Sequence, residues 1–238
     1  MTSLAAILAH AVVETARISI PTVLERASDH ETFDRRLDSW SKKLLDEAHI
    51  TLDVDGAGSV PDGEVVIMSN HASLYDIPVL FQSVPKRLRM VAKTELFRIP
   101  VWGRAMRASG FVELDRGNKE RAMAALQLAR KKMHEDRISI WIAPEGTRSK
   151  TGIMGPFKQG GFHLAIDAGL PILPVTIVGT HDVLAKGKSE IKTGVPIRVV
   201  MHAAIDALQW GHERRKELSA EVRRVIASAL PEELRGEG

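Results

Sequence analysis

The stretch EVVIMSNHASLYDIPVL, residues 64–80, passes from an apolar run through a polar segment and back to apolar residues. The run at 64–69 is continuous rather than alternating, which is typical of a strand buried on both faces of a sheet. The polar segment after it is of the kind that joins a strand to a helix. The stretch therefore predicts a strand-to-helix unit of an α/β fold.

The rest of the chain repeats this alternation of strands and helices. Six further segments have strand-like apolar patterns: 49–56, 87–93, 110–115, 138–143, 171–178 and 196–205. Apolar residues at helical spacing predict helices at 118–136, 159–169 and 212–230. We therefore expect a mixed, mostly parallel sheet of about seven strands flanked by helices.

Two amphipathic helices are predicted before this body. Apolar stripes run from Leu4 to Ile18 and from Phe33 to Ala48, and several cations lie beside the second stripe. Neither region supplies the ~20 uninterrupted apolar residues of a membrane span. A boundary near residue 48 divides a helical segment, 1–48, from an α/β domain, 49–238. The helical pair either packs on the domain or forms a monotopic membrane foot.

Composition excludes several functions. The 238 residues are 44% hydrophobic and 26% charged, as in ordinary globular proteins. A net charge of +3, with one tyrosine and six phenylalanines, is not typical of nucleic-acid binding. The absence of cysteine excludes disulfides, thiolate zinc sites and a cysteine nucleophile.

His71 and Asp76 lie in the polar segment, where ligands of α/β proteins bind, beyond the carboxyl end of a strand. If the segment after His71 becomes a helix, Asp76 can hold one ring nitrogen while the other accepts a proton from a hydroxyl. The alternative is that Asn70 and Asp76 cap the helix and His71 fills space.

Covalent and metal-assisted mechanisms have weaker support. No G-x-S-x-G elbow is present, so a base would act on a substrate hydroxyl directly. The spacing of His71 and Asp76 is not a zinc pattern, and neither metal nor cofactor is expected. His181-Asp182 hints at a phosphohydrolase but stands alone.

Anion-binding residues follow other strands. The loop Glu145-Gly146-Thr147-Arg148 offers N–H groups, a hydroxyl and a guanidinium. Arg116 and Lys93 would add cations at the same edge. Each observation has a simpler interpretation, such as surface pairs between Asp115 and Arg116 or between Glu145 and Arg148. Together with His71, these cations indicate a phosphate-bearing alcohol as substrate.

The same residues resemble the motifs of the 1-acylglycerol-3-phosphate acyltransferases. The pattern N-H-x-x-x-x-D stands at Asn70–Asp76, a glycine six residues before an arginine at Gly110–Arg116, P-E-G-T-R at Pro144–Arg148, and a proline in an apolar strand at Pro174. The likeness spans roughly residues 60–185. Glu113 and Ala143 depart from the aromatic residues that the family often has there, which leaves the acceptor's identity open.

The resemblance implies acyl transfer from acyl-CoA or acyl carrier protein to the 2-hydroxyl of lysophosphatidic acid. His71 would be the general base and Asp76 its orienting partner. Lys93, Arg116, Glu145, Gly146, Thr147 and Arg148 would bind the acceptor, and Gly146 is also a candidate donor to the oxyanion. The partners would be a lysophospholipid, an acyl thioester and a membrane surface at the cytoplasmic face of the cell membrane, with no nucleic acid. Other acceptors, such as glycerol 3-phosphate or a lyso-aminolipid, and a non-catalytic lipid-binding role remain alternatives.

Overall fold

The computed structural model describes residues 30–115, 117 and 119–236, and its seven strands form one sheet in the order β1-β7-β6-β2-β5-β3-β4. Each strand lies within one predicted segment: β1 (Thr51–Asp55), β2 (Val66–Ser69), β3 (Leu88–Lys93), β4 (Val112–Leu114), β5 (Ser139–Ile142), β6 (Ile172–Val178) and β7 (Pro196–Met201). Strands β6, β2, β5, β3 and β4 are mutually parallel, whereas β7 is antiparallel to β6 and parallel to β1. The expected mixed, mostly parallel sheet is confirmed.

The helices connect these strands and cover the sheet. They are α2 (His30–Glu47), α3 (Asp76–Ser83), α4 (Thr94–Phe97), α5 (Trp102–Ala108), α6 (Lys119–Glu135), α7 (Gly160–Ala168), α8 (Thr180–Val183) and α9 (Arg215–Ser228), with short 3-10 turns η1 (Ala57–Ser59), η2 (Ala207–Gln209) and η3 (Glu232–Leu234). The predicted helices at α6, α7 and α9 are confirmed. Gly169 ends α7 with a φ of 66°, a conformation that glycine adopts without strain.

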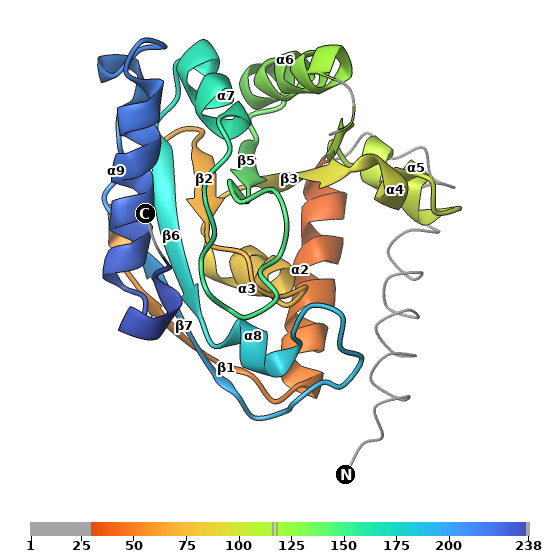
Figure 1. The fold of residues 1–238 in the computed structure, drawn as a ribbon. Coiled ribbons are helices and arrows are strands. Elements are labelled where there is room, and N and C mark those ends of the chain that lie inside the picture. The colour runs from red at the N-terminus through yellow and green to blue at the C-terminus, as the bar shows by residue number, and fades with distance from the viewer. Residues whose placement is uncertain (1–29, 116, 118, 237–238) are drawn as a thin grey trace.

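The sheet separates two hydrophobic clusters. Side chains of a strand point alternately to its two faces. Ile67 of β2 accordingly lies in the cluster with α2 and α3, whereas Val66 and Met68 lie in the cluster with α6, α7 and α9. Figure 1 shows these two groups of helices on opposite sides of the sheet. The fold is therefore a three-layer α/β/α sandwich.

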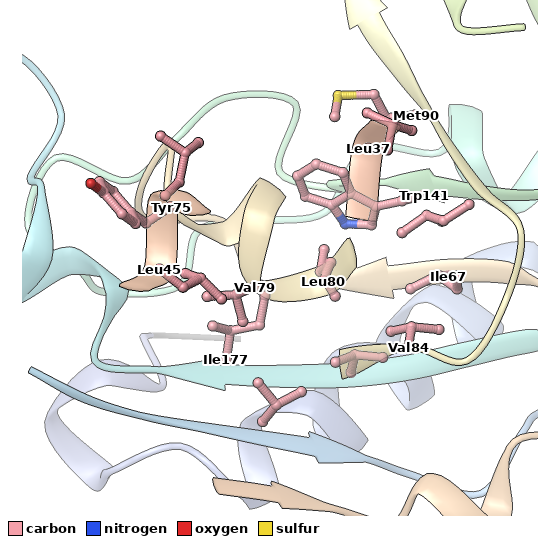
Figure 2. Packing of buried hydrophobic residues seen from close by; sticks show 14 of the residues in the cluster. Leu37, Leu45, Ile67, Tyr75, Val79, Leu80, Val84, Met90, Trp141 and Ile177 are labelled. Carbon is pink, nitrogen blue, oxygen red and sulfur yellow. The ribbon is translucent and has the colours of Figure 1, made fainter. Parts of the chain in front are cut away.

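Helix α2 is part of the first cluster. The side chains of its predicted apolar stripe are all buried: Phe33, Leu37, Trp40, Leu44 and Ala48. Figure 2 shows Leu37 and Leu45 of this helix packed in one cluster with α3 and strand residues. A boundary at residue 48 therefore does not separate two cores, and for α2 the packing alternative holds rather than a lipid-facing stripe.

A buried ion pair also ties α2 to the sheet. The guanidinium of Arg89 in β3 is 1% exposed, lies 2.7 Å from the Asp34 carboxylate of α2 and stacks over the Phe33 ring. Burial lowers the pKa of Arg89, and Asp34 opposes that shift. A charge removed from water needs such a partner, so the contact specifies where α2 docks.

The first predicted helix, from Leu4 to Ile18, lies outside the described residues. Within the described part of the chain, no helix combines the length and apolar character needed to cross a bilayer.

Candidate active site

His71 follows β2 at the carboxyl edge of the parallel strands. Its Nδ1 lies 2.7 Å from Oδ2 of Asp76, the first residue of α3, and the two side chains are 16% and 1% exposed. The predicted reach of Asp76 back to the ring is confirmed. Because a carboxylate oxygen accepts hydrogen bonds, Nδ1 carries the proton and Nε2 keeps a lone pair. This is the tautomer that a general base for a hydroxyl requires.

The Asp76 carboxylate also shapes the loop before α3. Its Oδ2 accepts hydrogen bonds from the backbone N–H groups of Ala72 and Ser73, at 2.8 and 2.9 Å. The alternative in which Asp76 merely caps a helix while His71 fills space does not describe this arrangement. One carboxylate oxygen both closes the loop and orients the imidazole.

Trp141 of β5 packs against the imidazole. The two rings meet edge to face with centroids 5.4 Å apart, and the indole N–H donates to the Ser69 hydroxyl at 3.0 Å. Trp141 is buried in the first cluster, and Figure 2 shows it among the packed side chains. The contact limits rotation of His71 away from Asp76. This role of Trp141 is not predictable from the sequence, because an aromatic residue in a buried strand has no distinctive pattern.

Glu145 connects the third motif to His71. Its Oε1 accepts the backbone N–H of His71 at 2.7 Å, and its Oε2 accepts that of Gly155 at 2.9 Å. The Ser149 N–H also donates to the carbonyl of His71 at 2.8 Å. Burial raises the pKa of Glu145, while the two N–H donors oppose that rise. Both oxygens are committed to the backbone, so Glu145 positions the loops.

The next residues, Thr147 and Arg148, have backbone N–H groups without an acceptor among the described residues. The Gly146 N–H, the expected donor to the oxyanion, already donates to the Ala143 carbonyl at 2.9 Å. In the described part of the chain, Arg148 makes no ion pair with Glu145. Two N–H donors and a half-buried guanidinium thus remain for an anion.

Lys93 and Arg116 belong to the neighbouring strand ends. Lys93 is exposed at the end of β3 and pairs in register with Leu114 of β4. Arg116 lies outside the described residues, so its side chain is not placed. The carboxylate of Asp115 accepts from Arg121 at 3.2 Å and from the Gly117 N–H at 3.0 Å. Lys93 therefore lies beside Leu114 at the end of the β3–β4 pair.

Comparison with family models gives a match to residues 51–178, described as Acyltransferase. The chain belongs to the acyltransferase family.

Several proteins similar to this chain are named 1-acyl-sn-glycerol-3-phosphate acyltransferase. The 1-acyl-sn-glycerol-3-phosphate acyltransferase of Escherichia coli (strain K12) is 33% identical over 71% of this chain and 68% of its own length. The protein of that name from Cocos nucifera is 31% identical over 70% of this chain, and the match spans only 54% of that protein. A crystal structure, the 1-acyl-sn-glycerophosphate (LPA) acyltransferase of Thermotoga maritima, superposes with a TM-score of 0.74 and 26% identity, covering 98% of this chain and 99% of that one.

Two other motif residues of the acyltransferase domain are structural. Asn70, which the sequence offered as a helix cap, instead bonds β6 with both ends of its amide. Its NH₂ donates to the Ile177 carbonyl at 2.8 Å and its oxygen accepts the Ile177 N–H at 2.9 Å. Pro174 lies within β6, in register with Met68. The pair at 181–182 lies within α8, where the His181 ring is 3.2 Å from the Lys150 carbonyl oxygen, to which it is hydrogen-bonded.

Glu113 departs from the family's usual aromatic residue. Its carboxylate accepts two hydrogen bonds from the Arg107 guanidinium, at 2.8 and 3.2 Å. The negative charge next to the cationic edge is therefore compensated within the protein, and it does not exclude an anionic acceptor.

Proposed function

We propose that this acyltransferase transfers a fatty acyl group from acyl-CoA or acyl carrier protein to the 2-hydroxyl of lysophosphatidic acid, which yields phosphatidic acid. The observation that carries the proposal is the 2.7 Å contact between His71 and Asp76 beside a loop with free N–H groups and cations. The names of the similar proteins support the same acceptor.

The reaction needs no covalent enzyme intermediate. Nε2 of His71 accepts the proton of the acceptor hydroxyl as its oxygen bonds to the thioester carbonyl carbon. The carbonyl electrons move to oxygen and form an oxyanion. When they return, the C–S bond breaks, and the thiolate takes the proton from the His71 imidazolium. A thiolate is a good leaving group, so one base and stabilisation of the oxyanion suffice.

The remaining residues bind and orient. Asp76 keeps the proton on Nδ1 and stabilises the imidazolium. The N–H groups of Thr147 and Arg148 are the candidate donors to the oxyanion, in place of the Gly146 N–H. Arg148, Lys93 and Arg116 are assigned to the acceptor phosphate, and the enzyme would act on lipid at the cytoplasmic surface of the cell membrane.

The test is thioester-dependent acylation of lysophosphatidic acid, with glycerol 3-phosphate and a lyso-aminolipid as competing acceptors. His71→Ala should lower kcat by roughly 10²–10⁴, the usual contribution of a general base. Asp76→Asn should also lower kcat, because an amide can stabilise the wrong tautomer. Equal rates in wild type and His71→Ala would refute the mechanism. A preference for another acceptor would refute the substrate.

A further inference from the structure

Three loops meet beside the cationic segment 146–148. Ser73, two residues after His71, forms an isolated antiparallel bridge with Ala185, and its hydroxyl donates to the Leu184 carbonyl at 2.8 Å. The next residue, Lys186, extends its ammonium to the third loop. There it donates to the Thr147 hydroxyl at 2.7 Å and to the Arg148 carbonyl at 2.9 Å. Lys186 thereby connects the His71 loop to the third motif.

The positive charge of Lys186 is not neutralised by these bonds. An ammonium has three N–H donors, and the two acceptors here are a hydroxyl and a carbonyl, which carry no formal charge. Within the described part of the chain, Lys186 forms no ion pair with a carboxylate. One donor and one full charge therefore remain next to Thr147 and Arg148.

The side chain of Lys158 also lies against the segment 146–148, at Gly146. A Cβ placed on Gly146 would lie 2.9 Å from its Cδ and 3.0 Å from its Nζ, so the side chain lies over the glycine. Its backbone N–H donates to the Pro144 carbonyl at 2.8 Å, which holds the two stretches together. Lys158 likewise has no carboxylate partner among the residues that the structure places. Because Gly146 has no side chain, Lys158 can lie over it.

Two ammonium groups thus contact three consecutive residues. Consecutive Cα atoms are about 3.8 Å apart, so both charges lie close to the free backbone N–H groups of Thr147 and Arg148. Glu145, the acidic neighbour in the loop, directs its oxygens to the N–H groups of His71 and Gly155 instead. The segment has more positive charge than one singly charged anion requires.

We infer that Lys158 and Lys186 bind the acceptor phosphate and select a phosphomonoester over a phosphodiester headgroup. The inference rests on the proposed acylation of a lysophospholipid. A phosphomonoester carries about −1.5 to −2 charge at pH 7, whereas a diester carries a single negative charge. Each additional cation therefore favours the monoester. The hydrogen bonds of Lys186 also position Thr147 and Arg148 for this contact.

The experiment compares two acceptors, lysophosphatidic acid and lysophosphatidylglycerol, in wild type, Lys158→Gln, Lys186→Gln and the double variant. Glutamine removes the charge but keeps a side-chain N–H donor. Lys188→Gln is the matched control, because Lys188 is an exposed lysine of the same loop with no side-chain contact to 146–148 among the described residues. Each single variant should lower the monoester-to-diester ratio of kcat/KM by about fivefold or more, mainly by raising KM for lysophosphatidic acid. The control should leave the ratio unchanged.

A binding measurement separates this inference from the proposed function. Inorganic phosphate should raise the Tm of the wild type, relative to chloride at equal ionic strength, and should not raise that of the double variant. If the wild type does not acylate lysophosphatidic acid but shows this difference, the proposed function fails and the anion site stands. If the wild type is active and the double variant keeps both its acceptor ratio and its phosphate response, the assignment of the lysines is wrong. An equal change in Lys188→Gln would also overturn it.

Discussion

At the scale of single residues, Glu145 joins three parts of the site with one buried carboxylate. Its two oxygens accept N–H groups from His71 and Gly155, which lie 74 and 10 residues away in the chain. Without the carboxylate, both donors would be unpaired in a partly buried setting. Unpaired N–H groups away from water lower the stability of the fold. The position of His71 therefore depends on a side chain that takes no part in the proposed proton transfer.

Replacing Glu145 should therefore destabilise the fold and displace His71. We expect Glu145→Ala to lower the free energy of unfolding by about 1–3 kcal/mol for each unpaired N–H group. Glu145→Gln should lose less, because the amide oxygen still accepts one of the two bonds. Urea denaturation measures both values. A variant to alanine that is as stable as the variant to glutamine would contradict this role.

The same carboxyl group predicts a pH dependence. Burial raises the pKa of Glu145 above its ordinary value of 4.5. The folded chain therefore binds this proton more tightly than the unfolded chain. The contribution of this proton to the unfolding free energy is fully present below pH 4.5, and it is lost as the pH rises through the folded-state pKa of Glu145. The difference in unfolding free energy between wild type and Glu145→Gln should fall over that range, and an increase would refute the assignment.

The contact between the two proposed catalytic residues was predictable from the sequence, whereas the contacts that hold the surrounding loops were not. His71 and Asp76 are close in sequence, so a strand-to-helix turn was enough to predict their contact. Lys186 bonds to a residue 39 positions away, and nothing in either segment indicates that pairing. Glu145 was expected to bind the acceptor because the family resemblance implies it. Its actual partners are backbone N–H groups, which leave no pattern in a sequence.

At the scale of elements, α2 resolves an ambiguity that periodicity cannot. An amphipathic stripe has the same spacing whether its apolar face meets a protein core or a bilayer. Here the stripe is buried against α3 and the sheet, and Arg89 pairs with Asp34 at the helix. Hydrophobic burial in α2 therefore contributes to folding.

Leu37→Ala tests the packing of α2. Leu37 is 4% exposed within the first cluster. Its truncation should cost about 2–5 kcal/mol of unfolding free energy, the usual range for a buried leucine. Lys42→Ala, on the exposed face of the same helix, should cost well under 1 kcal/mol, because its ion pair with Asp46 is at the surface. If Leu37→Ala instead leaves stability intact and weakens vesicle binding, α2 is a membrane element.

Strands were easier to predict than the short helices. All seven strands had continuous or alternating apolar patterns, so each was expected where it lies. Helices α4 and α8 contain four residues each, too few to show helical periodicity. The antiparallel pairing of β7 with β6 was also not predicted in detail. Strand direction depends on the path of the connection, here 179–195, in which only the four residues of α8 are regular.

At the scale of the whole molecule, exposed apolar side chains follow the strand ends that hold the site. Leu74 comes after β2, Ile99 and Val101 after β3, and Ile153 after β5; they are 41–48% exposed. Lysines and arginines lie in the same connections, including Lys93, Arg98 and Lys150. Apolar and cationic groups together are typical of a surface that meets anionic lipid. An acceptor that resides in a bilayer would enter from this side.

Because α2 belongs to the core, membrane association should depend on the residues before it. The apolar stripe from Leu4 to Ile18 is the sequence's candidate for that contact. A chain that begins at residue 30 should keep the cooperative thermal unfolding of the full chain but fail to sediment with vesicles containing phosphatidylglycerol. Neutral vesicles and added salt provide the controls, since attraction between cations and anionic lipid is screened. If the shortened chain sediments as the full chain does, the first helix is not the anchor, and the edge with Ile99, Val101 and Ile153 holds the bilayer instead.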